Sequence, residues 1–279
     1  MTFTTRFAPS PTGYLHLGHA FSAVLAHDHA RAAGGRFLLR IEDIDHTRCR
    51  PEYVAAIPED LAALGLDWDG GIWRQSQRRP VYQAVLDELR DRQLVYPCFC
   101  TRRQVAAHSP GQGVDGLIYG GTCRRLDDAA VATRLATGQQ PAWRLRLDKA
   151  LDLAGPITWH DGRAGRQVWS GEGLGDVVIA RRDIGISYHL AVVVDDAAQG
   201  VTDVIRGMDL FHQTSLHVLL QHLLDLPTPH YLHHQLLADD EGRKLSKSDG
   251  VRSLRDIFAD GIGGQEVAAR LREVIAGAT

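Results

Sequence analysis

Two histidines near the N-terminus stand where a strand, a turn and a helix follow one another. Residues 6–19 read Arg-Phe-Ala-Pro-Ser-Pro-Thr-Gly-Tyr-Leu-His-Leu-Gly-His, and a helix is predicted over residues 20–33. Because the first N–H groups of a helix lack partners, such a turn can bind an anion. His16 and His19 would face that anion, and Gly18 would let the backbone approach it closely. A turn with two exposed histidines is the competing interpretation.

A second candidate loop lies far downstream. Residues 244–248 read Lys-Leu-Ser-Lys-Ser and offer two ammonium groups and two hydroxyls. Alone, such a loop is typical of a solvated surface turn. Paired with the histidine motif at the far end of an interrupted nucleotide-binding fold, it indicates a site for phosphate groups.

The segments after the first motif predict a parallel sheet with crossover helices. A buried strand over residues 36–41 ends at Glu42, and helices are predicted over residues 51–64 and 80–94. The β-α-β-α order is typical of an α/β fold. In open α/β sheets ligands bind at the carboxyl ends of the strands, so Glu42 is a candidate binding residue.

From residue 95 to about residue 182 the pattern changes to short alternating strands and many glycines, which predicts an inserted α+β unit. Its expected elements are strands over residues 143–147, 167–169 and 176–180 and a helix over residues 128–136. The α/β pattern resumes at residues 187–194, Ser-Tyr-His-Leu-Ala-Val-Val-Val, whose composition predicts a central strand. A strand over residues 203–207 and helices over residues 213–226 and 265–275 complete the expected order.

Composition restricts the class of protein. The chain has 279 residues, of which 44% are hydrophobic and 23% charged, as expected for a globular protein of two or three packed units. It shows neither a secretory leader pattern nor a long apolar run, so we expect a cytoplasmic location. A net charge of −3 argues against broad non-specific binding of nucleic acids. The four cysteines, three of them clustered, do not form a disulfide framework.

The two loops together resemble those of a class I aminoacyl-tRNA synthetase of the glutamyl type. Residues 16–19 match its HIGH motif and residues 244–248 its KMSKS motif, each with one apolar change to Leu. The segment Phe-Ala-Pro-Ser-Pro-Thr-Gly and the run Arg-Ile-Glu-Asp at residues 40–43 are similar to the glutamyl and glutaminyl branch. The resemblance runs from residue 3 to about residue 250.

This resemblance implies a Rossmann-like α/β nucleotide-binding fold that is split by an α+β, zinc-containing insert. The expected division is a first Rossmann half over residues 1–94, an acceptor and zinc subdomain over 95–186, a second Rossmann half over 187–237, and the KMSKS loop with a helical segment over 238–279.

The resemblance also implies the reaction. The carboxylate of glutamate attacks the α-phosphorus of ATP, which gives glutamyl-adenylate and pyrophosphate, so the protein supplies positioning and charge stabilisation. His16, Gly18 and His19 would bind ATP at the helix N-terminus, and Lys244 and Lys247 would close over its phosphates. Mg²⁺ would accompany the nucleotide.

Glutamate carries two carboxylates and one ammonium group, so its pocket needs two cations and one anion. Arg6 and Arg206 can each bind a carboxylate in a bidentate manner, Glu42 can accept from the ammonium group, and Tyr188 adds a hydroxyl. These positions correspond to the glutamate contacts of the resembled family. The same correspondence adds the neighbouring turn, which comprises Phe7, Ala8, Pro9 and Ser10.

Glutamyl-tRNA synthetases continue beyond the catalytic core as a helical anticodon-binding unit, and this sequence stops before one. In that respect it resembles the glutamyl-Q tRNA(Asp) synthetase family. The resemblance implies activation of glutamate without tRNA, and transfer of the glutamyl group to queuosine at the wobble position of tRNA(Asp) by a monomer. The alternatives are a truncated or discriminating glutamyl-tRNA synthetase that charges a tRNA 3′ end, a nucleotidylyltransferase, and a synthetase-like protein without activity.

The clustered cysteines fit the same family. Cys98, Cys100 and Cys123 lie in the predicted insert, and the resemblance implies that they bind one structural Zn²⁺ together with Tyr119. Phenolate is an uncommon ligand, so His108 competes for the fourth position. Buried free thiols are the alternative to a metal site.

Overall fold

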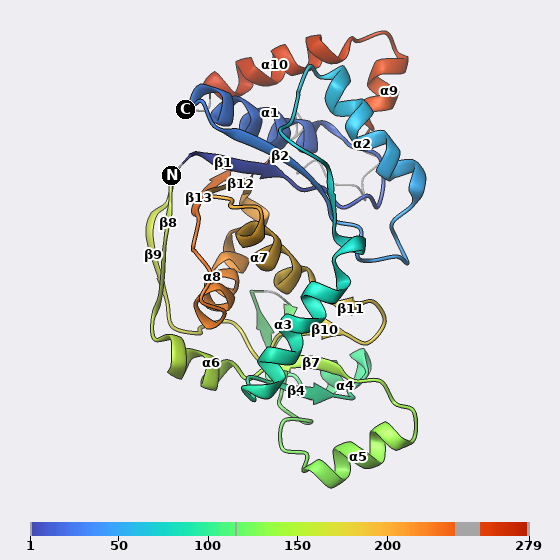
Figure 1. Cartoon of the computed structure of the whole chain (residues 1–279), viewed down its shortest axis with the longest axis vertical. Coiled ribbons are helices and arrows are strands. Elements are labelled where there is room, and N and C mark those ends of the chain that lie inside the picture. Colours follow the sequence, from blue (N-terminus) through green and yellow to red (C-terminus); the bar gives the residue numbers. More distant parts are fainter. Residues whose placement is uncertain (1, 115, 238–251, 278–279) are drawn as a thin grey trace.

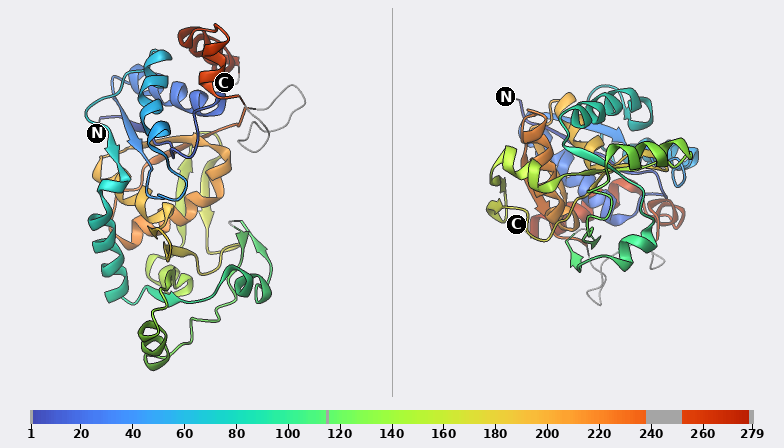
Figure 2. Two further views of the ribbon diagram at one scale, coloured as in Figure 1. Left: turned by 90° about the vertical axis from the view of Figure 1, so that its right-hand side faces the viewer. Right: turned by 90° about the horizontal axis from the view of Figure 1, so that it is seen from below.

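The structure is a computed structural model that describes residues 2–114, 116–237 and 252–277. The molecule is elongated, with α1 (Leu17–Ala32), α2 (Pro51–Ala63) and α10 (Gly264–Gly277) at one end and α5 (Asp128–Ala136) at the other (Figures 1 and 2). Among the described residues, no helix has the length and apolar character needed to cross a membrane.

The first half of the chain builds a small parallel sheet. Its strands are β1 (Thr4–Phe7), β2 (Arg36–Ile41) and β3 (Trp73–Arg74), in the order β1-β2-β3. The helix α1 connects β1 to β2 and packs on both, as the sequence predicts for a crossover helix. It begins at Leu17, three residues before the predicted start.

A second sheet continues this layer. It contains β12 (Asp203–Gly207), β13 (His230–His234), β8 (Ile157–Asp161) and β9 (Gly165–Trp169), in the order β12-β13-β8-β9. The strands β12 and β13 are parallel, as are β13 and β8. Because the backbone N–H of Thr202 donates to the carbonyl of Thr4 at 2.9 Å, β12 lies beside β1. The two sequence-distant halves of the α/β pattern therefore meet at β1 and β12.

The remaining strands of residues 95–186 form an antiparallel sheet. Its order is β11-β10-β7-β4, and its strands are β4 (Val95–Cys98), β7 (Ala142–Leu145), β10 (Val178–Arg181) and β11 (Gly185–Ile186). Around it lie the helices α4 (Arg102–Ala107), α5 and α6 (Leu147–Ala154) and the small hairpin of β5 (Gln112–Gly113) and β6 (Gly116–Leu117). The predicted helix over residues 128–136 is confirmed. The hairpin of β8 and β9 leaves this unit and pairs with β13.

The predicted central strand over residues 187–194 is wrong, because these residues open the helix α7 (Tyr188–Ala198). The Ser187 hydroxyl caps the helix by accepting from the backbone N–H of Leu190. Residues 190–196 are all buried, so the run carries no amphipathic period that would separate a buried helix from a buried strand. Tertiary packing thus overrides the strand preference of its three valines.

Further helices complete the layers around the sheets. They are α3 (Arg79–Asp91), α8 (Thr214–Leu223) and α9 (Leu254–Ala259), with short 3₁₀ turns η1 (Gln75–Gln77) and η2 (Met208–Gln213). The helices α7 and α8 pack together in the larger hydrophobic core, which continues into the insert through Leu145 and Ile179.

The buried contact between α3 and α7 predicts a stability effect. The Tyr82 hydroxyl, on a side chain without exposed surface, donates to Asp195 Oδ2 at 2.7 Å. We expect Tyr82→Phe to lower the free energy of unfolding by about 1.5–3 kcal/mol, the contribution of a hydrogen bond to a charged group. Urea unfolding measures the change, and Tyr14→Phe, at a side chain that is 39% exposed, is the control. Equal unfolding midpoints for both variants would contradict the prediction.

Candidate active site

The N-terminus of α1 holds the histidine pair in a reciprocal cap. His16 is the N-cap residue, and its Nδ1 accepts from the backbone N–H of Gly18 at 3.1 Å. His19 Nδ1 accepts from the backbone N–H of His16 at 3.3 Å, and the ring centroids are 3.8 Å apart. Since each Nδ1 accepts a hydrogen bond, each neutral ring carries its proton on Nε2. A Cβ atom at position 18 would lie 3.0 Å from the His16 ring, so a larger residue here would require that ring to shift by a few tenths of an ångström.

The second predicted loop, residues 244–248, lies outside the described part of the chain. Lys244 and Lys247 fall in the undescribed range 238–251, so their predicted roles stay predictions. On its far side, Ser253 forms a β-bridge with His16, and the N–H of Leu254 donates to the carbonyl of Leu15 at 2.7 Å. The chain that follows the second motif thus contacts the cap of the first.

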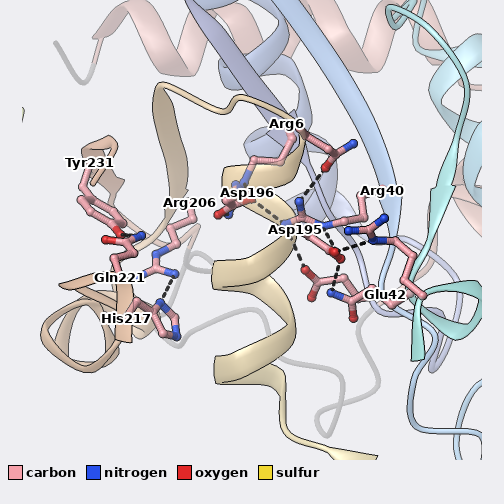
Figure 3. A network of polar contacts seen from close by, with 12 residues as sticks. Arg6, Arg40, Glu42, Asp195, Asp196, Arg206, His217, Gln221 and Tyr231 are labelled. Atoms are coloured by element: carbon pink, nitrogen blue, oxygen red, sulfur yellow. Dashed lines mark hydrogen bonds and ion pairs between the residues drawn. The ribbon is translucent and has the colours of Figure 1, made fainter. Parts of the chain in front are cut away.

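A buried cluster of charges lies at the carboxyl ends of β1 and β2, against α7 (Figure 3). Asp196 accepts from Arg6 Nε at 2.9 Å and from Arg40 Nη2 at 2.7 Å. Arg40 also reaches Glu42 at 3.5 Å. Asp195, the preceding residue of α7, accepts from Arg78 Nε at 2.7 Å. The carboxylates of one helix therefore hold arginines from three other segments.

Glu42 is the acid of this cluster whose pKa is raised toward neutral pH. Burial raises its pKa to about 7, although the nearby guanidinium groups of Arg40 and Arg6 oppose that rise and Asp196 adds to it. For Asp196 the balance is reversed: burial alone would raise its pKa, but Arg6 and Arg40 hold it below the ordinary value. Glu42 is therefore the group that could change its charge near neutral pH.

Arg206, at the end of β12, is buried among neutral acceptors. Its Nε donates to His233 Nε2 at 3.0 Å, its Nη1 to His217 Nδ1 at 3.2 Å, and its Nη2 to Thr214 Oγ1 at 2.7 Å and the Leu210 carbonyl at 3.3 Å. Among the ion pairs of the described residues, none includes Arg206. Within residues 2–114, 116–237 and 252–277, this buried guanidinium therefore has no carboxylate partner of the kind that Arg6 and Arg40 share.

Tyr188 connects the two groups of charges. Burial raises the pKa of its hydroxyl; Arg206 and Arg6 act against that rise, and Glu42 adds to it. The predicted residues Arg6, Glu42, Tyr188 and Arg206 thus share one electrostatic environment, as Figure 3 shows for the three that it labels. Tyr188 also lines a cavity of about 380 Å³ that opens toward the insert and includes Arg144, Asp176 and Tyr119.

The turn after β1 lies beside Glu42. Phe7 and Pro9 are buried, Ala8 is half-buried and Ser10 is exposed. The carbonyl of Pro9 accepts from the backbone N–H of Glu42 at 3.0 Å. The structure therefore brings this predicted segment next to the predicted acid.

The cysteines of the insert converge with Tyr119. The Sγ atoms of Cys98, Cys100 and Cys123 lie within 4.8 Å of one another. The Tyr119 hydroxyl is 3.4 Å from the sulfurs of both Cys98 and Cys100, and the sulfurs of Cys100 and Cys123 are 3.5 Å apart. A tetrahedral zinc with these ligand types has ligand–ligand spacings of roughly 3.5–3.8 Å, so the four groups fit one metal ion.

His108 does not join this cluster, because its Nδ1 pairs with the Gln104 carbonyl at 2.9 Å on an exposed surface. Among the described His, Cys, Asp and Glu residues, the three cysteines are the group close enough to share a metal. The geometry thus favours Tyr119 over His108 as a fourth ligand.

Sequence reasoning missed several residues of the site, namely Arg40, Asp161, Asp196, His217 and His233. Asp196 was missed because a strand was predicted for residues 187–194, so the helix that carries this acid was not expected. A signal existed in Ser187, a good N-cap residue in front of an apolar run that ends in two acids. The two histidines and Asp161 follow no motif and are found only from their contacts with and around Arg206.

Comparison with known proteins identifies the family of this chain. The profile of the family "tRNA synthetases class I (E and Q), catalytic domain" matches residues 2–268. The glutamyl-Q tRNA(Asp) synthetase of Rhodobacter capsulatus is 51% identical over 270 residues, which cover 92% of this chain and 95% of that protein. The protein of the same name from Neisseria meningitidis serogroup B is 42% identical over 246 residues, covering 88% of this chain and 80% of its own.

Solved structures show the same fold. A glutamate tRNA ligase from Elizabethkingia meningosepticum, in complex with its amino acid, superposes with a TM-score of 0.76 at 30% identity and covers 90% of this chain. The chain spans about half of that ligase, 53% of its length. The predicted α/β class I synthetase fold with a parallel sheet is therefore confirmed. The chain belongs to the class I tRNA synthetases, and within them to the ligase family whose members are named glutamyl-Q tRNA(Asp) synthetase.

Proposed function

We propose that this protein activates L-glutamate with ATP and Mg²⁺, without needing tRNA, and transfers the glutamyl group to queuosine at the wobble position of tRNA(Asp). Two curated relatives, 42% and 51% identical over most of the chain, are named glutamyl-Q tRNA(Asp) synthetase, and that name supports the proposal. Its substrates and acceptor belong in the cytoplasm, and the protein would act as a monomer. The proposal keeps the predicted division of the chain after residues 94, 186 and 237.

The observation that carries the proposal is the buried Arg206. Arg206 forms no ion pair with any described residue, a buried charge without a counter-charge is costly, and a substrate carboxylate would supply an anion. Its contacts with described residues engage four of its donor positions and leave a guanidinium N–H for that carboxylate. Arg6, already paired with Asp196 through Nε and Nη2, would present its Nη1 to the other carboxylate. Glu42 would then accept from the ammonium group, and Tyr188 and the turn of Phe7, Ala8, Pro9 and Ser10 would close the pocket.

ATP would lie across the N-terminus of α1. Its phosphates would meet the helix N–H groups, Gly18 and the rings of His16 and His19, whose protons stand on Nε2. Lys244 and Lys247 would stabilise the charge that develops on the leaving pyrophosphate. No covalent enzyme intermediate is needed, since the bound carboxylate is itself the nucleophile.

The cavity between Tyr188 and the insert suits the acceptor. It combines a basic wall of Arg144 and Arg181 with the carboxylate of Asp176, and it adjoins the proposed glutamate pocket through Tyr188. An RNA loop could place a base there while the arginines meet its phosphates. A structural Zn²⁺ bound by Cys98, Cys100, Tyr119 and Cys123 would fix the position of Tyr119 in the wall of this cavity.

The acceptor is tested by comparing tRNAs. Incubation with ATP, radiolabelled glutamate and tRNA(Asp), with or without queuosine, should label only the modified tRNA. Removal of the 3′ adenosine should leave that labelling unchanged, because the glutamyl group goes to the anticodon loop. Labelling of an intact 3′ end on unmodified tRNA would instead indicate a glutamyl-tRNA synthetase.

The pKa of Glu42 predicts how glutamate binding depends on pH. Above about pH 7 its carboxylate is ionised and can accept from the ammonium group; as the pH falls through that value it takes up a proton. The KM for glutamate in pyrophosphate exchange should therefore rise at lower pH, approaching about tenfold per pH unit. The pKa of Asp196 is held below its ordinary value and that of Arg40 is raised by the carboxylates around it, so both groups keep their charge in this range. Glu42→Gln should show a high KM that is independent of pH, and a flat wild-type profile would contradict the assignment.

The zinc site is tested by metal analysis of the purified protein. Wild type and Cys49→Ser should contain one zinc per chain, because Cys49 lies outside the cluster. Cys100→Ser should lose the metal and unfold at a lower temperature, since binding a structural metal stabilises the folded state. Tyr119→Phe should weaken zinc retention against a chelator, whereas His108→Ala should not. Weaker zinc retention in His108→Ala than in Tyr119→Phe would instead assign the fourth ligand to His108.

A further inference from the structure

The environment of Arg206 depends on a carboxylate that does not touch it. Asp161, at the end of β8, accepts at Oδ2 from His233 Nδ1 at 2.7 Å and from the His233 backbone N–H at 3.0 Å. His233 and Asp161 have no exposed surface. On the other side of the same ring, Nε2 accepts from Arg206 at 3.0 Å. A continuous chain of contacts thus runs from Asp161 through the imidazole to the guanidinium.

The contacts determine which nitrogen of His233 carries the proton. A carboxylate can only accept, so Nδ1 must be protonated; a guanidinium can only donate, so Nε2 must be the acceptor. A cationic ring would turn a second N–H toward Arg206, and its pKa of about 4, lowered by burial and by that guanidinium, keeps the ring neutral. The same logic applies to His217, whose Nδ1 faces Arg206 and whose Nε2 lies 3.1 Å from His189 Nδ1.

Packing holds the His233 ring in this plane. The Tyr231 ring is stacked on it at an interplanar angle of 8°, and the Phe211 and Trp159 rings meet it edge-on at 5.1 and 5.8 Å. Asp161 is held as firmly, because its Oδ1 accepts from the backbone N–H groups of Arg163 and Ala164 in the turn of the β8–β9 hairpin. Neither partner can rotate without breaking several contacts.

We infer that Asp161 and His233 are positioning residues for glutamate recognition, which aim the Arg206 guanidinium by fixing the imidazole in its Nδ1–H tautomer. The inference rests on the proposed function, in which Arg206 binds a carboxylate of glutamate. It assigns to the β8–β9 hairpin a part in substrate affinity, although its residues belong to the segment that interrupts the α/β pattern.

Asp161→Asn tests the tautomer. The amide can keep the turn contacts through its oxygen but would present an NH₂ group to His233, which favours a ring proton on Nε2 pointing at Arg206. We expect the KM for glutamate to rise about 10–100-fold, the effect of misplacing one charge-assisted contact, while the KM for ATP changes less than about threefold. Asp60→Asn, at a buried acid whose ion pair is with Arg255, is the matched control and should change neither value.

A double variant separates positioning from general damage. His233→Gln keeps an oxygen that can accept from Arg206 but has no tautomer to transmit, so Asp161→Asn should add little to its KM for glutamate. Additive effects of the two changes would overturn the inference. The wild-type protein gives an independent test that requires no variant: ¹⁵N NMR of the histidine rings should show His233 as the neutral Nδ1–H form. An Nε2–H or doubly protonated ring would also overturn it.

The outcome is distinguishable from failure of the proposed function. If the wild type shows no glutamate-dependent pyrophosphate exchange, the proposed function fails. If exchange occurs and Arg206→Lys raises the KM for glutamate, but Asp161→Asn does not, the proposed function stands and the positioning role is refuted.

Discussion

The double ion pair of Asp196 with Arg6 and Arg40 is the interaction on which the rest of the site depends. It joins α7, in the second half of the chain, to β1 and β2, in the first. All three side chains are buried, so each charge is tolerable only because the others are present. With Asp195 holding Arg78 and Tyr82 one residue away, the same helix also attaches the segment that leads into α3. The two halves of the chain are therefore joined by buried charge as well as by apolar packing.

Two buried arginines of this region have different partners, and the difference separates a structural role from the binding role that we propose. Arg40 is paired with the carboxylates of Asp196 and Glu42 and donates to Gln199, so its charge is balanced within the fold. Arg206 is solvated by two neutral imidazoles, a hydroxyl and a carbonyl. Such acceptors satisfy the geometry of the guanidinium without cancelling its charge. The site thereby keeps an electrostatic demand for an anion.

How much of this could be predicted differs between local and non-local features. The histidine pair at a helix N-terminus was predicted from a turn, a glycine and two histidines within four residues, and the structure places both residues there, although their reciprocal cap was not predicted. The cysteine cluster with Tyr119 was predicted only by resemblance, since Cys-x-Cys with one distant Cys does not by itself specify a fourth ligand. The sequence could not distinguish the helix α7 from a strand, because a run that is buried on every side shows no periodic pattern of apolar and polar residues. The Asp161 and His233 pair joins residues 72 positions apart and has no local pattern at all.

The pairing of β8 with β13 has a mechanical consequence. A unit attached to a host domain by one pair of crossings can swing as a rigid body about a hinge between them. Here the β8–β9 hairpin of the interrupting segment pairs with β13 of the host sheet. The rest of the segment therefore cannot rotate about its first connection, at β4, alone. Bending would have to be absorbed beyond the hairpin, near Gly155, whose φ of +68° ends α6 just before β8 begins. If the proposed RNA acceptor displaces the rest of the interrupting segment, the strand that carries Asp161, and with it the proposed glutamate pocket, would thus stay in place.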